Sequence, residues 1–482
     1  MNSLRFILLL ALGLLPLSSG RSGQPSAARA ASADSRPNIL VIMTDDQTVE
    51  QMRVLPKTRA LLAARGTSFA NSFVDIALCC PSRSTFLTGQ YAHNHGVLAN
   101  GGPHGGYPHL DHKNTLPVWL QEAGYYTAHI GKYLNNYGES SPEPPAGWSR
   151  WFGLIDPTTY RLFNYTVSDD GTPVNYKDSA KDYQTDVIAE KADEVLRSRV
   201  GSGQPFFLTV APTSPHLERL SRNGDQIPPR PAPRFAGKFG AEPLPVKSSF
   251  DEADVADKPA NISGRPRLSP AKKARVAETY RACLASLLAV DDLVEKLVKT
   301  LDDTGQLGRT VVIFTSDNGF FFGEHRVTEG KYLPYEESIR VPLIIFDGRN
   351  AAGGFPAGAT VTQPVSNIDL APTIVALAGA RARRVMDGQP LLPLVRDPQK
   401  GKDRTLLIEG YGEGKDKPPF TAVRDPRWFY AEYKNGDREL YDLQTDPNEL
   451  RSLHADPAFA AVRKDLASRL AKLRACSGGS CR

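Results

Sequence analysis

The sequence predicts an α/β fold with a large mixed, mostly parallel sheet flanked by helices, and a small C-terminal α+β subdomain with an antiparallel sheet. Short apolar, β-branched runs such as PNILVIMTDD and TVVIFTSDNG end in polar or glycine-rich residues, which is typical of buried strands. Long helical patterns separate these runs, and strands that alternate with helices form parallel sheets covered on both faces. From about residue 400 the strand patterns become closely spaced, which indicates a second, antiparallel unit.

The segment 1–33 is typical of a secretory signal peptide. An apolar run from Phe6 to Leu17 follows Arg5, and small residues lead to a predicted cleavage site near residues 30 to 33. The run is shorter than the roughly 20 apolar residues that cross a membrane. We therefore expect a mature chain with no membrane span, secreted to an extracellular or periplasmic space, or lysosomal in a eukaryote.

The segment from residue 34 to residue 399 predicts one large domain. YYTAHIGKY, PFFLTVAP and VPLIIFDG are further expected strands, and residues 270–305 form an expected long helix that ends at Gly305. Residues 218–270, rich in proline, glycine and charge, predict a surface excursion that is either a wall of the ligand site or an ordered insertion. Ligands of such sheets bind at the carboxyl ends of the strands.

Residues 400–482 predict the small α+β subdomain. RTLLIEGY, FTAVRDPRWFYAEYK and RELYDL look like successive antiparallel strands, KNGD like a hairpin turn, and PAFAAVRKDLASRLAKLRA like an amphipathic helix. Cys476 and Cys481 are spaced for a small-loop disulfide in an oxidising compartment. Cys283 lies in an apolar helical pattern and is expected to be a buried, inert residue.

The charge balance is mild, with 58 Lys and Arg against 53 Asp and Glu in 482 residues. The basic residues are scattered along the chain, so no nucleic-acid partner is indicated. The net charge of +5 suits an anionic substrate, but charge alone favours a solvated mixed surface over that interpretation.

Acidic residues follow two of the expected strands. Asp45 and Asp46 come after the first strand, and Asp317 and Asn318 come after TVVIFTS. Either pair alone is more often a helix cap or a turn, but both pairs at strand ends favour a metal site. Three carboxylates and one amide oxygen suit Ca²⁺ or Mg²⁺ rather than Zn²⁺.

The stretch LCCPSRSTFLTG places Cys79 beside Cys80. Adjacent cysteines rarely bridge each other, because the link strains the intervening peptide. Pro81 marks an expected helix start, which puts Cys79 at a helix N-terminus that favours an anion, with Arg83 able to reach back to it. The spacing excludes a thiolate-dependent phosphatase, because the position that would need arginine, counted from Cys79, is Thr85.

The same stretch resembles the signature of the type I, formylglycine-dependent sulfatases, through C-x-P-S-R followed by Thr-Gly. Other segments resemble parts of that family and occur in the same order along the chain. ILVIMTDD resembles the first metal-binding strand, GKY resembles the catalytic-lysine segment, and SPH resembles the histidine segment. TSDNG resembles the second metal pair, EGKYLPYEESIRVPLI resembles the final lysine segment, and ELYDLQTDPNE resembles the terminal subdomain. The resemblance spans the chain from about residue 36 to its end.

This resemblance implies an alkaline-phosphatase-like fold, with a sulfatase catalytic domain at residues 34–399 and the C-terminal subdomain at 400–482. It implies that Cys79 is oxidised to Cα-formylglycine (3-oxoalanine) by a formylglycine-generating enzyme. It also implies a Ca²⁺ ion, with Mg²⁺ admitted by the same donors; the implied metal ligands are Asp45, Asp46, residue 79, Asp317 and Asn318.

The family chemistry assigns a role to each matching residue. One hydroxyl of the hydrated aldehyde at residue 79 attacks the sulfur of a sulfate ester, and the second expels sulfate and restores the aldehyde. The resemblance implies that Arg83 holds the hydrated aldehyde and that Lys132 and Lys331 bind sulfate oxygens. His216 is the implied general acid.

Two segments point to a subgroup. GKYLNNYG and LTGQYAHNHGV resemble the N-acetylglucosamine-6-sulfatases and the extracellular heparan-sulfate 6-O-endosulfatases. Asn135 and His95 are the expected substrate contacts, although His95 equally suits a structural turn. We expect a 6-O-sulfated glucosamine-type sugar, as found in glycosaminoglycans, or an aryl sulfate. The alternatives are a phosphate or phosphonate monoester hydrolase of the same superfamily and a secreted carbohydrate-binding protein without catalysis.

Overall fold

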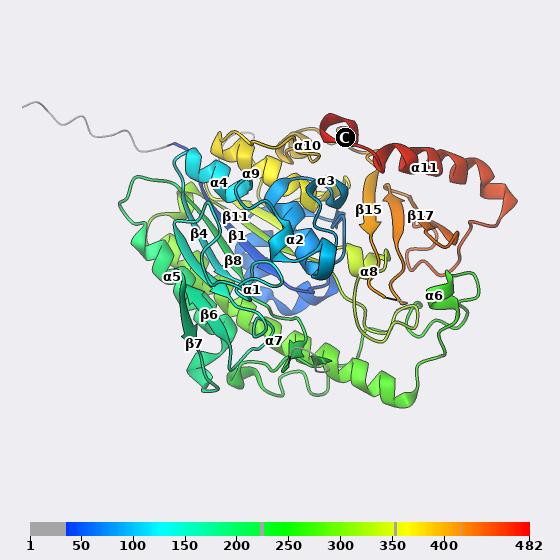
Figure 1. Ribbon diagram of the computed structural model, residues 1–482, viewed down its shortest axis with the longest axis horizontal. Coiled ribbons are helices and arrows are strands. Elements are labelled where there is room, and N and C mark those ends of the chain that lie inside the picture. Colours follow the sequence, from blue (N-terminus) through cyan, green and yellow to red (C-terminus); the bar gives the residue numbers. More distant parts are fainter. Residues whose placement is uncertain (1–34, 222–225, 351–353, 415) are drawn as a thin grey trace, which may run out of the picture. The chain divides into compact units, whose positions relative to one another are not determined.

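The computed structural model describes residues 35–221, 226–350, 354–414 and 416–482 (Figure 1). The expected signal peptide at 1–33 lies outside the described residues. Within the described ranges, no helix is both long enough and apolar enough to cross a membrane.

A ten-stranded sheet forms the centre of the fold, in the order β13–β2–β12–β11–β1–β8–β4–β5–β6–β7 (Figure 1). Its strands are β1 (Asn38–Thr44), β2 (Thr67–Phe69), β4 (Tyr126–Gly131), β5 (Arg150–Leu154), β6 (Thr166–Asp169), β7 (Thr172–Asn175), β8 (Phe206–Ala211), β11 (Thr310–Ser316), β12 (Leu343–Asp347) and β13 (Ala359–Val361). The five central strands from β11 to β5 pair in parallel. This confirms the expected mixed, mostly parallel sheet, although β12, the VPLIIFDG segment, runs antiparallel to β11.

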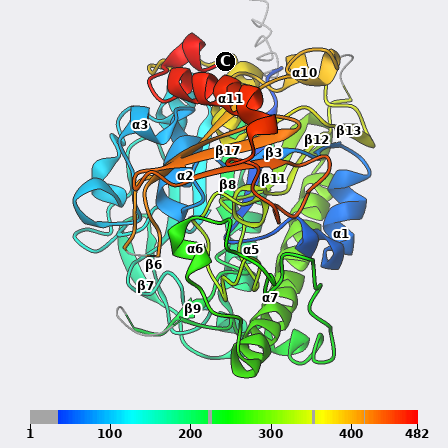
Figure 2. The same cartoon turned by 90° about the vertical axis from the view of Figure 1, so that its right-hand side faces the viewer.

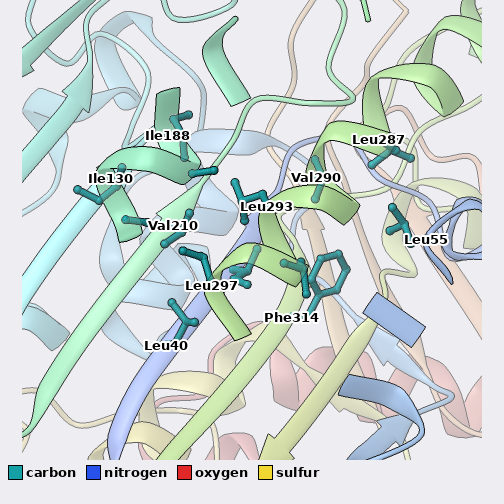
Figure 3. Packing of buried hydrophobic residues seen from close by; sticks show 14 of the residues in the cluster. Leu40, Leu55, Ile130, Ile188, Val210, Leu287, Val290, Leu293, Leu297 and Phe314 are labelled. Atoms are coloured by element: carbon teal, nitrogen blue, oxygen red, sulfur yellow. The ribbon is translucent and has the colours of Figure 1, made fainter. Parts of the chain in front are cut away.

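Helices cover both faces of this sheet. Alternate side chains of a strand point to opposite faces, so a strand that is apolar throughout needs a packing partner on each face. On β1, Leu40 and Ile42 belong to one hydrophobic cluster, and Ile39 and Val41 belong to another. The first cluster includes α5 (Gln184–Ser198) and α7 (Pro270–Asp303), and Figure 3 shows α7 packing onto the strands. The second includes α2 (Cys79–Thr88), α4 (Leu116–Glu122) and α9 (Leu370–Ala378).

The long helix α7 confirms the helix expected from residue 270 onward. It begins with Pro270 at its first position, and the Ser269 side chain accepts a hydrogen bond from the Lys272 amide. Cys283 lies on this helix and is buried, as expected. The chain turns out of the helix at Gly305, whose φ of +67° is the left-handed conformation that glycine adopts without strain.

Helix α2 begins at Cys79, two residues before the expected start at Pro81. The first turn of a helix needs no internal N–H partner, so a proline at its third position is tolerated. All ten residues of α2 are buried, and Gly89 ends the helix with a φ of +67°.

The C-terminal segment forms a four-stranded antiparallel sheet covered by a helix, which confirms the expected α+β unit. The sheet contains β15 (Leu406–Gly410), β16 (Phe420–Arg424), β17 (Trp428–Tyr433) and β18 (Arg438–Asp442). FTAVRDPRWFYAEYK forms two strands rather than one, because Asp425 accepts hydrogen bonds from the amides of Arg427 and Trp428 and closes a turn. Figure 2 shows α11 (Ala460–Leu473) lying along this sheet, and Cys476 and Cys481 are joined by the expected disulfide.

One face of the C-terminal sheet packs on the segment that leads into α2. Leu406, Ile408 and Phe429 share a buried cluster with Phe73 and Leu78. The terminal subdomain therefore helps to position the helix that carries Cys79.

Candidate active site

The pairs Asp45–Asp46 and Asp317–Asn318 meet at the carboxyl edge of the central sheet. Strands β1 and β11 are parallel neighbours with Thr44 opposite Ser316, so the residues that follow each strand converge. The Asp46 amide donates to Asp317 Oδ1 (3.2 Å), and Asn318 Nδ2 donates to Asp46 Oδ1 (2.6 Å). Asp45 is fully buried beside them.

Cys79, the first residue of α2, points at the same place. Its Sγ donates to Asp45 Oδ1 (3.4 Å) and accepts from Lys331 Nζ (2.8 Å), and Lys331 also contacts Asp46 Oδ1. Burial, with the nearby Asp45 carboxylate, raises the pKa of the Cys79 thiol to about 12. An unmodified Cys79 is therefore protonated at neutral pH and is a poor nucleophile.

Two further cations complete the cluster. Lys132 follows β4, and its Nζ contacts Asp45 Oδ2 and lies 3.8 Å from Asp317 Oδ2. Arg83, on α2, donates from Nε to Asp317 Oδ2 (2.7 Å) and from a guanidinium nitrogen to the Lys132 carbonyl (2.9 Å). Both side chains are almost fully buried, which is rare for Lys and Arg outside paired sites.

The charges of the cluster keep most of its members ionised. Burial alone would raise the pKa of Asp45, but Lys132, His216, Lys331 and Arg83 together hold that pKa well below its ordinary value. Burial and the Asp45 charge raise the pKa of Asp317. Burial disfavours the charged form of Lys132, and the Asp45 carboxylate outweighs that effect, so the pKa of Lys132 is raised.

His216 faces the cluster through Nε2, which lies 3.5 Å from Asp46 Oδ2. Its Nδ1 lies 2.6 Å from the carbonyl of Leu217, so Nδ1 carries the proton of the neutral ring. Burial lowers the pKa of His216 to about 4. The ring stacks on Tyr160 (4.2 Å between centroids), and Lys132 Nζ lies 4.6 Å from the centre of the same tyrosine ring.

Tyr160 has no signal in the sequence. It lies in the loop between β5 and β6, far along the chain from every other member of the cluster, and no motif marks it. The ring orders Lys132 and His216 together, one by a cation–π contact and one by stacking.

A cavity of about 400 Å³ opens over the cluster. It is lined by Asp46, His216 and Lys331 at the cluster and by polar residues further out, namely Asn135, Asn136, Glu139, Asp156, Arg219, Glu413 and Lys417. Arg219 comes from the excursion after residue 218, so that excursion contributes a wall of the cavity. Glu413 and Lys417 belong to the loop between β15 and β16, so the terminal subdomain contributes another.

The structure places the two expected substrate contacts differently. Asn135 lines the cavity, where its Nδ2 donates to the Tyr160 hydroxyl (2.6 Å) and its buried Oδ1 has no partner among the described residues. His95 does not line the cavity. Its Nε2 lies 3.1 Å from Thr85 Oγ1, and its Nδ1 accepts a hydrogen bond from the Val97 amide (3.1 Å). His95 therefore stabilises a local turn, as its alternative role predicted.

The donors at this edge fit a hard divalent cation. One donor atom from each of Asp45, Asp46, Cys79 and His216 lies within 4.8 Å of the others. Asn318 Oδ1 is buried beside them and has no hydrogen-bond partner within the described part of the chain. Ca²⁺ and Mg²⁺ are bound in proteins by carboxylate and amide oxygens. The carboxylates of this cluster and the unpartnered amide oxygen of Asn318 are ligands of that kind.

Comparisons with known proteins agree with this site. Residues 37–380 match the sulfatase family model, and residues 323–476 match the model for the C-terminal region of N-sulphoglucosamine sulphohydrolase. An arylsulfatase of Volvox carteri is 36% identical over 507 residues, which covers 95% of this chain and 77% of that protein. The N-acetylglucosamine-6-sulfatase of Homo sapiens is 31% identical over 508 residues, which covers 94% of this chain and 87% of that protein.

A solved structure of a protein in complex with its substrate D-glucosamine-2-N,6-O-disulfate has a TM-score of 0.76 and 25% sequence identity to this chain. The match covers 91% of this chain and 97% of the other. The family match spans most of the chain and includes every residue of the cluster at the sheet edge. The chain therefore belongs to the sulfatase family, and it is an enzyme that hydrolyses sulfate esters.

Proposed function

We propose that this enzyme cleaves sulfate monoesters with a Cα-formylglycine at position 79 as its nucleophile, on 6-O-sulfated glucosamine-type sugars in preference to aryl sulfates. The observation that carries the proposal is the place of Cys79, which contacts both Asp45 and Lys331. Lys331 in turn lines the polar cavity. The Sγ atom occupies the Cβ substituent position that an oxygen takes after oxidation.

The cation of this site would be held by the residues at the two strand ends and by residue 79. We infer Ca²⁺, with Mg²⁺ accepted by the same oxygen donors, namely Asp45, Asp46, Asp317 and Asn318. When bound, the ion offsets the charge of the carboxylates and makes a hydroxyl at residue 79 more acidic.

Each remaining residue has a task set by its position. As one hydroxyl of hydrated residue 79 attacks sulfur, its proton passes to His216 Nε2, which is unprotonated in the neutral ring. The ester S–O bond breaks, and His216 Nε2 gives that proton to the departing alcohol oxygen. Lys132 and Lys331 stabilise the charge that moves over the sulfate oxygens, and Arg83 orients residue 79 from α2. The second hydroxyl then loses its proton to solvent water and becomes the carbonyl of the aldehyde, while the C–O bond that joins residue 79 to the sulfate group breaks. Inorganic sulfate leaves, and a water molecule hydrates the aldehyde again.

The lining of the cavity supports a sugar substrate. The unpartnered Asn135 Oδ1 and the carboxylate of Asp156 offer acceptors for sugar hydroxyl groups, and Arg219 and Lys417 offer cationic donors for a further acidic substituent. One similar protein is named an N-acetylglucosamine-6-sulfatase, and the similar solved structure holds D-glucosamine-2-N,6-O-disulfate as its substrate. The similarity to an arylsulfatase supports aryl sulfates as the second substrate class.

We also infer export of this enzyme, with residues 34–399 as the catalytic domain and 400–482 as the terminal subdomain. The disulfide between Cys476 and Cys481 supports an oxidising compartment. The maturation partner inferred for Cys79 is a formylglycine-generating enzyme.

The mass of the peptide that contains residue 79 tests the nucleophile. We expect the peptide from the natural host to be lighter by about 18 Da than the unmodified cysteine peptide, because SH and H are replaced by a carbonyl oxygen. Tandem mass spectrometry assigns the loss to Cys79 rather than Cys80. An unmodified thiol in catalytically active protein from that host would overturn the mechanism.

A panel of three esters tests the substrate class. We expect kcat/KM to be at least about tenfold higher for glucosamine 6-sulfate than for an aryl sulfate, because the polar cavity wall pairs only with a sugar. The value of kcat/KM for the aryl sulfate should in turn exceed that for the matching aryl phosphate by roughly 10²-fold. A preference for the phosphate ester would instead favour a phosphate or phosphonate monoester hydrolase.

A further inference from the structure

A second cluster of metal-binding side chains lies outside the catalytic cluster. It consists of His325, Glu337 on α8 (Glu336–Ile339) and Glu449, which follows β18. Their exposed fractions are 0%, 8% and 1%. Two of the three come from the segment between β11 and β12, and the third comes from the terminal subdomain.

Each of the three side chains turns an unpaired atom toward the others. His325 Nε2, Glu337 Oε2 and Glu449 Oε1 are buried and have no hydrogen-bond partner among the described residues. His325 Nε2 lies 4.0 Å from Glu337 Oε2, and one donor atom from each residue lies within 4.8 Å of the others. Three buried, unsatisfied acceptors that face one another would cost several kcal/mol if nothing lay between them.

The other polar atom of each side chain is already held. His325 Nδ1 donates to Glu252 Oε2 (2.7 Å), Lys247 Nζ donates to Glu337 Oε1 (2.9 Å), and the Glu336 amide donates to Glu449 Oε2 (3.0 Å). These contacts fix which atom of each residue faces the cluster.

The histidine is prepared as a ligand. Its Nδ1 proton is directed to a carboxylate, so the Nε2 lone pair faces the two glutamates, and this carboxylate–histidine arrangement is the usual support of a metal-bound imidazole. The ring also stacks on Tyr335 (4.2 Å between centroids), and the His325 backbone has a φ of +48° and donates its amide to the Ser249 carbonyl (2.8 Å).

We propose that His325, Glu337 and Glu449 bind a divalent transition metal, with Zn²⁺ as the best fit. One imidazole nitrogen and two carboxylate oxygens form a three-ligand set with room for a fourth donor, which suits Zn²⁺ better than the hard cations. His325 Nε2 and Glu337 Oε2 are 4.0 Å apart, and all three donor atoms lie within 4.8 Å of one another. Sides of 4.0 to 4.8 Å put the centre of the triangle roughly 2.3 to 2.8 Å from each atom, so a small inward shift of the side chains would give Zn–N and Zn–O bonds of about 2.1 Å. The donor set differs from the oxygen-rich catalytic cluster.

One member of the cluster borders a cavity. Glu337 lines a cavity of about 290 Å³ together with Lys247 and Glu324, and this cavity is the route that we infer for an ion. The bound ion would join Glu449 of the terminal subdomain to the segment that also carries Lys331. The site would therefore stabilise the contact between the two subdomains next to the active site.

Zinc binding to the full chain tests the proposal. The protein is stripped with a chelator, supplied with Ca²⁺ for the catalytic cluster, and titrated with Zn²⁺ alone in equilibrium dialysis. We expect the wild type to bind one more Zn²⁺ than Glu449→Gln or His325→Gln, with affinity at that site reduced at least ~100-fold in either variant. Glu324→Gln is the matched control, because Glu324 is a buried carboxylate that lines the same cavity but is not one of the three proposed ligands, and this variant should retain the site.

The melting temperature separates a metal from a buried proton. Zn²⁺ should raise the Tm of the wild type and of Glu324→Gln, and leave that of Glu449→Gln unchanged. If Glu449 is instead a protonated carboxyl, glutamine mimics it. The Tm of Glu449→Gln would then match or exceed that of the wild type, and Zn²⁺ would change the Tm of neither protein. Equal zinc stoichiometry in the wild type, Glu449→Gln and His325→Gln would also overturn the proposal.

Discussion

Replacing Cys79 with alanine is expected to lower the turnover of sulfate esters by about 10⁴-fold or more, because alanine cannot become an aldehyde and the nucleophile is lost. The matched change at Cys80 is expected to leave most of the turnover. Cys80 is buried among apolar side chains, and its amide donates to Asn100 Oδ1 (2.8 Å), a bond that alanine keeps. Initial rates on a sulfate ester, measured with both variants from the natural host, check this pair.

The two cysteine variants also control for folding. Both positions are fully buried, so the melting temperature of each variant, measured beside the rates, shows whether a loss of turnover comes from unfolding. A similar loss of turnover in both variants would show that the wrong cysteine, or the wrong role, has been assigned.

Replacing Lys331 with methionine is expected to lower kcat by roughly 10²–10³-fold, which is the usual cost of removing one group that stabilises transition-state charge. Methionine keeps the length of the side chain but removes the cation that contacts both Cys79 and Asp46. Steady-state kinetics on a sulfated glucosamine separate kcat from KM.

Lys417→Met is the matched control for this lysine. Lys417 lines the same cavity and pairs with Glu413 (3.1 Å), with no contact to the catalytic cluster. We expect its loss to raise KM for a doubly sulfated sugar and to leave kcat nearly unchanged. If both variants lowered kcat alike, the cavity would act only through its overall positive potential and Lys331 would have no separate role.

The position of the catalytic cluster could be predicted because it depends on strand ends. An apolar run followed by two polar residues marks the carboxyl end of a buried strand, and β1 and β11 are adjacent and parallel, so Asp45 and Asp317 meet. The direction of β12 could not be predicted from its sequence. Its apolar pattern is the same whichever way the strand runs, and only the connection from β11 makes it antiparallel.

The rest of the site depends on contacts between distant loops. Tyr160 holds Lys132 and His216 through ring contacts that leave no periodic or motif signal. His95 follows the helix that contains the signature and belongs to a resembling segment, yet Thr85 and the Val97 amide occupy its ring nitrogens. The cluster of His325 and Glu449 joins residues more than a hundred positions apart, so no local pattern indicates it.

The complete burial of α2 sets an order of events in the life of the chain. Cys79 has no exposed surface, and the residues around it that form the C-x-P-S-R segment are buried on all sides by the sheet and the terminal subdomain. If Cys79 is oxidised as proposed, the modifying enzyme would have to read that segment while the chain is unfolded. Maturation and folding would then compete in time, and a molecule that folds first would keep an inert thiol. The fraction of active enzyme in a preparation would be set by the ratio of those two rates.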